Sequence, residues 1–171
     1  MSLPSHSVYL PDAEHTRAAG YALGQALTRY QVAQPLVIAL NGELGVGKTT
    51  FVGGLLNALG YIGTVRSPTY TLIEPYEFSC DSDVLTVFHL DLYRLTDPAQ
   101  LEELGFRDLL QPNAVLLIEW AERAGNALAE PDLAINLAYT TATAGRDLML
   151  VPTTAVAAQL IHSMHDYLGT R

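Results

Sequence analysis

The segment Gly42–Thr50 has the residue types and the spacing of a phosphate-binding loop. It reads GELGVGKTT and fits the pattern G-x-x-x-x-G-K-[ST], called Walker A. Glycines let backbone N–H groups close around phosphate oxygens, and the N-terminus of the following helix adds a partial positive charge. Lys48 would reach the β- and γ-phosphates, and the hydroxyl of Thr49 would bind Mg²⁺. The segment therefore predicts a site for a nucleotide and its metal ion.

The segments on either side of this loop are those that a phosphate-binding loop requires. Residues Leu36–Leu40 are continuously apolar, as in a strand buried on both faces. After the loop, apolar residues recur at helical spacing up to Gly60, which can end the helix: Phe51, Leu55, Leu56 and Leu59. A glycine-rich turn without a ligand is the alternative. Against it, Lys48 is the only lysine among the nine basic residues of the chain.

Two carboxylates end segments that are expected to be strands. Asp91 lies near the end of the β-rich run Val84–Tyr93, and Glu119 follows the apolar run Val115–Ile118 in a Walker-B-like pattern. Open α/β sheets place ligand-binding groups at the carboxyl ends of their strands. With Lys48, these two acids are the predicted catalytic residues. Mg²⁺ takes only one or two carboxylates, so one acid could hold the metal while the other orients the attacking water. The sequence leaves these two roles open.

Three further features allow both a structural and a functional interpretation. Ser67 and Thr69 flank Pro68, either in an ordinary surface loop or in a switch loop that offers hydroxyls to a phosphate or metal. Trp120 is the only tryptophan; it either packs in the core or lies beside the nucleotide. His89 is expected to be a packed structural histidine.

Composition and length fit one domain over residues 1–171. Residues 1–7 are expected to form a flexible tail, although Ser7–Leu10 could add an edge strand. No apolar run approaches ~18 residues and no signal peptide is visible, so neither a membrane span nor export is expected. Cys80 is the only cysteine, which excludes an internal disulfide and favours a reducing cytoplasm.

The charge of the chain bears on its partners. The net charge is −9, and the sequence shows no cluster of basic residues. Strong direct binding to nucleic acid is therefore not expected, because such binders carry a basic patch. P-loop GTPases that are specific for guanine carry an Asn/Thr-Lys-x-Asp element. This chain cannot have that element, because it has no lysine besides Lys48. ATP is accordingly preferred over GTP.

The remaining segments predict alternating helices and strands, hence an α/β fold. Asp12 is expected to cap a helix that runs to about Tyr30, and Asp97 to begin a short helix. Thr153 or Thr154 would cap a final helix that Gly169 follows. Further strands are expected at Tyr70–Glu74, with a polar hairpin connection at Glu77–Asp83, and in an antiparallel hairpin of Asp132–Tyr139 with Arg146–Val151.

Four strings of residues together resemble the TsaE (YjeE) family. They are GELGVGKTTF, VRSPTYTLIEPY, FHLDLYRLTDPAQLEELGFRD and LLIEW, in this order, within a resemblance from about Asp12 to Val151. SPTYTL and DLYRL are far more specific than Walker A, because generic P-loop proteins lack them. TsaE proteins are small bacterial ATPases of the tRNA threonylcarbamoyladenosine pathway.

The resemblance implies a P-loop NTPase-like domain whose mainly parallel central sheet is flanked by antiparallel strands. It implies ATP and Mg²⁺ as ligands, weak hydrolysis by the isolated protein, and TsaD and TsaB as partners. With them it would install threonylcarbamoyl on adenosine 37 of tRNAs that read codons beginning with A, meeting the tRNA only indirectly. The expected nucleotide-binding residues are Glu43, Leu44, Gly45, Val46, Gly47, Lys48, Thr49, Thr50, Thr69 and Trp120. The expected metal ligands are Thr49, Asp91 and Glu119, and Ser67–Thr71 would act as a switch.

Two other functions compete with this interpretation. The first is a small P-loop kinase that phosphorylates a metabolite, but the arginine-rich lid of such kinases is not visible in the sequence. The second is a nucleotide-gated binding module in which hydrolysis is incidental.

Overall fold

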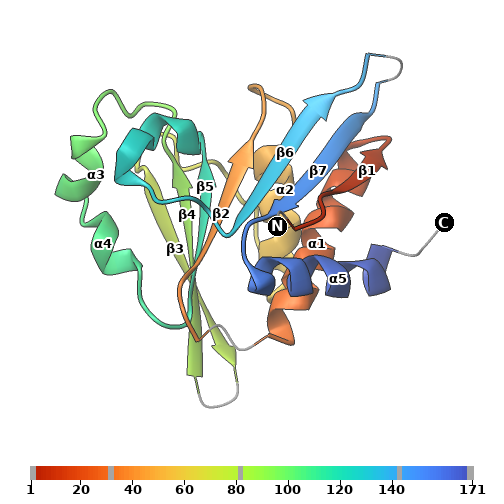
Figure 1. Ribbon diagram of the computed structural model, residues 1–171, viewed down its shortest axis with the longest axis horizontal. Helices are drawn as coiled ribbons and strands as arrows, with labels where there is room; N and C mark the ends of the chain where they lie inside the picture. Colours follow the sequence, from red (N-terminus) through yellow and green to blue (C-terminus); the bar gives the residue numbers. More distant parts are fainter. Residues whose placement is uncertain (1–2, 31–32, 81–82, 142–143, 169–171) are drawn as a thin grey trace.

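A seven-stranded mixed sheet forms the centre of the protein, in the order β1-β7-β6-β2-β5-β4-β3 (Figure 1). The computed structural model describes residues 3–30, 33–80, 83–141 and 144–168. The strands are β1 (His6–Leu10), β2 (Leu36–Asn41), β3 (Ile73–Cys80), β4 (Asp83–Asp91), β5 (Ala114–Glu119), β6 (Leu133–Tyr139) and β7 (Arg146–Pro152). The helices are α1 (Ala13–Thr28), α2 (Lys48–Ala58), α3 (Ala99–Glu103), α4 (Phe106–Leu109), α5 (Ala155–Leu168) and the 3₁₀ helix η1 (Ala121–Ala127).

The four central strands, β6, β2, β5 and β4, are parallel, and the outer strands β1, β7 and β3 pair antiparallel. The expected α/β architecture is thus confirmed. Parallel pairing brings the carboxyl ends of β2, β5 and β4 to one edge of the sheet. In the register of these strands, Glu119 lies opposite Leu40 on one side and opposite Asp91 on the other. The two predicted acids are therefore next to each other.

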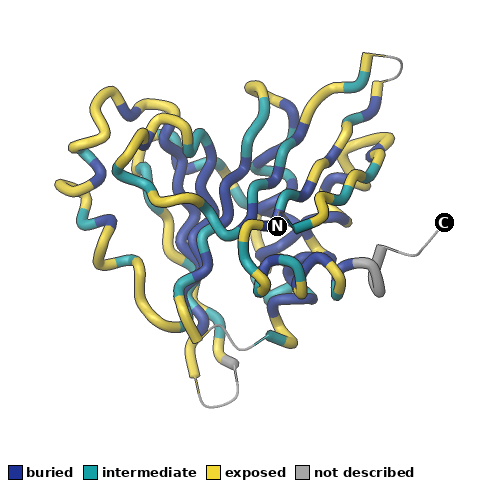
Figure 2. Tube along the Cα trace, in the orientation of Figure 1, coloured by how far each residue is buried: buried dark blue, intermediate teal, exposed yellow. Residues whose placement is uncertain are grey.

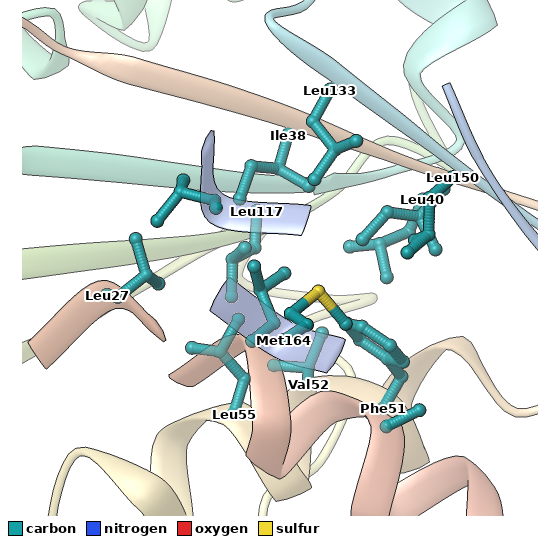
Figure 3. Close-up of a cluster of buried hydrophobic side chains, with 14 of the residues drawn as sticks. Leu27, Ile38, Leu40, Phe51, Val52, Leu55, Leu117, Leu133, Leu150 and Met164 are labelled. Carbon is teal, nitrogen blue, oxygen red and sulfur yellow. The ribbon is translucent and has the colours of Figure 1, made fainter. Parts of the chain in front are cut away.

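β5 is buried on both faces, and it separates two hydrophobic clusters. Val115 and Leu117 join the larger cluster, which α1, α2 and α5 cover. Figure 3 shows Leu117 there, among side chains of β2, β6, β7 and the helices. Leu116 and Ile118 join the smaller cluster with residues of α3, α4 and η1. Figure 2 shows the burial of the central strands between these two layers.

Glycines let α1 approach α2 closely. A Cβ added to Gly20 would lie 1.9 Å from the carbonyl oxygen of Phe51, and one added to Gly54 would lie 2.0 Å from that of Arg17. No real side chain tolerates such distances, so only glycine allows this packing. Because α2 begins at Lys48, these glycine contacts also hold the helix that follows the predicted phosphate-binding loop.

Several sequence-based expectations about the strands need correction. The edge strand that Ser7–Leu10 could add is present as β1, which begins at His6, so the expected tail of residues 1–7 is too long by two residues. Residues 70–72 form a turn rather than a strand, because the Leu72 N–H donates to the Pro68 carbonyl at 2.7 Å and Leu72 has a φ of 65°. β3 therefore starts only at Ile73.

The hairpin connection expected at Glu77–Asp83 is also shorter than predicted. β3 continues to Cys80 and β4 begins at Asp83, because Tyr76 and Phe78 alternate toward the larger core cluster while their polar neighbours face outward. β6 pairs antiparallel with β7, as predicted, but parallel with β2.

The predicted starts of α1 and α5 agree with the structure, whereas α3 begins at Ala99, two residues after the predicted start at Asp97. The Asp12 carboxylate accepts the His15 N–H at 2.9 Å, and the Thr154 hydroxyl accepts the Ala157 N–H at 3.4 Å. The side chain of Gln100 accepts the Asp97 N–H at 3.2 Å, as a capping box requires. Gly169 and the Cys80 side chain lie outside the described residues. Among the helices within the described ranges, none is long and apolar enough to span a bilayer.

Candidate functional site

A cavity of about 260 Å³ lies at the carboxyl ends of β2, β5 and β4, where β2 turns into α2. Figure 1 shows the positions of these strands and of α2. Its walls come from four separate parts of the chain. The lining residues are Leu44, Gly45, Gly47, Lys48, Thr49, Thr50, Ser67, Thr69, Asp91, Tyr93, Glu119 and Trp120. All the residues that the sequence predicts as catalytic or metal-binding are in this set.

The segment Gly42–Lys48, here called the glycine loop, has a backbone that few other residues could adopt. Gly45 and Gly47 have φ angles of 80° and 120°, in the region that favours glycine. α2 then begins without a side chain that caps its N-terminus. The first N–H groups of a helix have no partner within the helix, so this end of α2 offers donors and partial positive charge to an anion.

Lys48 is buried, with only 4% of its surface exposed. Its Nζ donates to the carbonyls of Gly42 at 2.7 Å and Glu43 at 3.0 Å, and lies 4.4 Å from the centre of the Trp120 ring. Burial lowers the pKa of Lys48 below its ordinary value of 10.5, and the nearby carboxylate of Glu119 opposes that shift. The ammonium group is thus held at the cavity by carbonyl oxygens and an aromatic face.

The carboxylate of Glu119 contacts both the first turn of α2 and a buried side chain of β4. Its Oε1 accepts the Thr49 hydroxyl at 3.0 Å and lies 2.9 Å from Nε2 of His89. His89 is fully buried, as expected of a packed histidine, but it also contacts a predicted catalytic acid. Sequence reasoning did not find this contact, although His89 and Glu119 lie on neighbouring strands.

The carboxylate of Asp91 holds the loop after α2 against the cavity. Its Oδ2 accepts the hydroxyls of Ser67 and Thr69, the latter at 2.9 Å, and its Oδ1 accepts the Tyr93 N–H at 2.9 Å. From the sequence, the Ser67–Thr69 segment could be either an ordinary surface loop or a switch loop. The structure places both hydroxyls at the cavity, as a switch loop requires.

Trp120 and Tyr93 form an aromatic wall of the cavity, with ring centres 5.0 Å apart. Trp120 has a φ of 59°, which is unusual for a bulky side chain and turns the chain sharply after Glu119. The alternative in which Trp120 lies at the site is thus favoured. Tyr93 was not predicted; its position two residues after Asp91 is the signal that could have found it.

Two predicted nucleotide-binding residues do not line the cavity. Glu43 provides only the backbone carbonyl that Lys48 contacts, and the Val46 side chain is fully buried in the larger core cluster. Within the described ranges, no group of three or more His, Cys, Asp and Glu side chains could hold a metal ion. A metal held here would rely on hydroxyl and water oxygens beside the two acids.

Comparison with known proteins gives the same result as the sequence motifs. The profile described as "Threonylcarbamoyl adenosine biosynthesis protein TsaE" matches residues 10–148. The chain belongs to the TsaE family. It is 37% identical over 137 residues to the tRNA threonylcarbamoyladenosine biosynthesis protein TsaE of Haemophilus influenzae, covering 80% of this chain and 84% of that one. It is 38% identical over 99 residues to the protein of the same name from Bacillus subtilis, covering 58% and 59%.

The fold also has a close match among solved structures. A crystal structure of Bacillus subtilis YdiB superposes with a TM-score of 0.73 over 99% of both chains, at 24% identity. At that identity the likeness supports the fold alone. Membership in the TsaE family connects the chain with biosynthesis of tRNA threonylcarbamoyladenosine, and the resemblance seen in the sequence is confirmed.

Proposed function

We propose that this chain is a P-loop NTPase-like protein that binds Mg-ATP in the cavity and hydrolyses it in support of tRNA threonylcarbamoyladenosine biosynthesis. The observation that carries the proposal is the register of the sheet. Asp91 and Glu119 end adjacent parallel strands and meet Lys48 and Thr49 in one cavity. Phosphoryl transfer depends mostly on positioning and on neutralising charge, and this constellation supplies groups for both.

The residues present fit a nucleotide phosphate chain. The glycine loop and the uncapped N-terminus of α2 offer backbone donors, and Lys48 offers a cation at the same place. The Lys48 ammonium donates two of its hydrogens to the loop carbonyls of Gly42 and Glu43. Its third N–H is then left to donate to a β- or γ-phosphate oxygen, and hydrogen bonds to a charged acceptor are the stronger ones.

The residues also fit Mg²⁺, because Thr49, Asp91 and Glu119 present oxygen donors, which this ion prefers. When bound, Mg²⁺ would neutralise charge on the phosphates. Asp91 is held by Ser67, Thr69 and the Tyr93 N–H, and Glu119 is held by His89 and Thr49. Each acid is therefore fixed in place before a ligand arrives, as a metal ligand or a group that orients water must be.

The proposed setting is a complex with TsaD and TsaB in the cytoplasm, with the tRNA held by those partners. The family membership and the net charge of −9 support this setting independently, because an acidic chain has little attraction for RNA.

Reconstitution tests the proposal. Purified TsaD, TsaB, tRNA, ATP and the threonylcarbamoyl donor are combined with and without this chain, and modified adenosine is counted over many turnovers. We expect modification to require the chain and to fail with Lys48→Met, whereas Arg107→Ala, an exposed control charge paired with Glu102, should act as wild type. Equal modification without the chain would refute the pathway assignment. Normal turnover by Lys48→Met would refute the ATPase assignment.

A further inference from the structure

Two side chains of the β6–β7 hairpin hold the outer side of the glycine loop. The Tyr139 hydroxyl donates to the Gly45 carbonyl at 2.8 Å, and Nε of Arg146 donates to the Val46 carbonyl at 2.5 Å. Tyr139 ends β6 and Arg146 begins β7, and the two residues are partners in the strand register. The Arg146 guanidinium also lies 5.5 Å from the centre of the Tyr139 ring. The two side chains and the two loop carbonyls therefore form one connected cluster.

The backbone geometry makes this contact relevant to anion binding. In a trans peptide the carbonyl and the following N–H point in opposite directions. Arg146 holds the Val46 carbonyl toward the hairpin, so the Gly47 N–H must point to the opposite side of that peptide. Gly47 lines the cavity. A Cβ added to Gly47 would lie 3.5 Å from Nε of Arg146, so the arginine packs directly against the back of the loop.

The loop is thus held from two sides. On the inner side, Lys48 donates to the carbonyls of Gly42 and Glu43. On the outer side, Tyr139 donates to the Gly45 carbonyl and Arg146 to the Val46 carbonyl. An ammonium has three N–H donors, so Lys48 can keep both carbonyls and donate its third hydrogen to a phosphate, and the hairpin contacts can persist as well. The hairpin contacts lie on the side of the loop away from the phosphates, so they can keep the loop in shape without competing with the ligand.

We infer that Tyr139 and Arg146 are positioning residues for phosphate recognition: Arg146 orients the peptide whose Gly47 N–H faces the cavity, and Tyr139 fixes the preceding peptide, whose Val46 N–H donates to the Glu43 carbonyl at 3.3 Å. The contacts of Tyr139 and Arg146 with the loop are observed in the structure. Their role in phosphate recognition rests on the proposed nucleotide-binding function. Neither residue lines the cavity, and neither is expected to touch the ligand. They would raise the affinity for phosphate by holding the loop in its binding conformation beforehand, which lowers the entropic cost of ordering the loop on binding.

Hydrogen exchange of the nucleotide-free protein tests the geometry first. Arg146→Ala and Tyr139→Phe should each speed exchange in a peptide that covers the glycine loop, while exchange in α1 and β5 stays unchanged. Arg107→Ala and Tyr21→Phe serve as matched controls, because both side chains are exposed and lie on other elements. Unchanged exchange in the loop of both hairpin variants would overturn the inference, whether or not the protein binds a nucleotide.

Competition binding then tests the purpose. ADP, inorganic pyrophosphate and adenosine are compared, each with Mg²⁺ present. Arg146→Ala should weaken ADP and pyrophosphate by roughly tenfold, the value of about one hydrogen bond, and leave adenosine unchanged. Arg146→Lys should recover part of the loss, because it can still donate to the Val46 carbonyl.

Loss of adenosine affinity with pyrophosphate unchanged would overturn the inference, since Arg146 would then contact the nucleoside. Failure of the wild type to bind ADP would refute the proposed function, and the exchange result would still decide the role of the hairpin.

Discussion

The buried ammonium group of Lys48 is suited to the proposed phosphate binding, but its burial opposes folding. Burial of its ammonium group costs free energy, which is why the pKa of this side chain lies below 10.5. The carbonyls of Gly42 and Glu43 and the ring of Trp120 offset part of this cost. A cation would not be kept in such a place for folding alone, since an apolar side chain of similar length could fill it.

Lys48→Met should separate these two roles. We expect nucleotide affinity to fall roughly 10- to 100-fold, because charge-assisted hydrogen bonds to phosphate are lost. The free energy of unfolding at pH 7, measured by urea denaturation, should be equal to or higher than that of the wild type. A large loss of stability would mean that the lysine serves the fold.

The lowered pKa also predicts how this comparison changes with pH. Between the lowered folded pKa of Lys48 and 10.5, the unfolded chain binds more protons than the folded one, so the wild type gains stability as pH rises. Lys48→Met lacks this titration. The wild type should therefore gain on the variant as pH rises toward 10.5, and a difference that stays constant would contradict the assigned cause.

Asp91→Asn and Glu119→Gln test the two acids without changing their size. Each variant should lower ATP turnover by about 10²-fold, the usual contribution of a general acid or base. The affinity for ADP should change much less, and the fluorescence of Trp120 at the cavity can measure it. If affinity and turnover fall together for one acid, that acid acts mainly by holding the metal.

At the scale of elements, the site depends on how α1 holds α2. The glycines of these helices allow backbone contact, and α2 carries Lys48 and Thr49 in its first turn. Periodicity predicted both helices, because apolar residues at helical spacing are a local signal. The turn at Leu72 and the full length of β3 were not predicted, because a hydrogen bond to Pro68 and burial against the core decided them.

Adjacent glycines of α2 offer a matched test of this packing. Gly54→Ala should destabilise the protein by about 1–3 kcal/mol or more, because the new methyl group meets the Arg17 carbonyl. Gly53→Ala meets only the end of the Arg17 side chain and should be neutral or stabilising by up to ~1 kcal/mol. Thermal unfolding of the two variants measures the difference. Equal effects would show that helix propensity, rather than close packing, matters here.

At the scale of the whole molecule, charge is the feature most relevant to partners. The net charge is −9, and the sequence gathers no basic cluster. We expect the isolated chain not to bind tRNA in a filter-binding assay even at about 50 mM salt, where contacts to phosphates are strongest. A salt-sensitive complex with tRNA alone would contradict the proposal that the partners hold the RNA.

The sequence by itself determined the glycine loop and the two acids at strand ends. These signals are local: a motif of fixed spacing, apolar runs that predict parallel strands, and the family motifs SPTYTL and DLYRL. The tertiary structure alone decided that Lys48 is buried, that His89 contacts Glu119, and that Arg146 holds the glycine loop. The contact of Arg146 with Val46 joins residues 100 positions apart in the chain. Such contacts follow from the packing of strands and helices in space, which no local pattern of residues records.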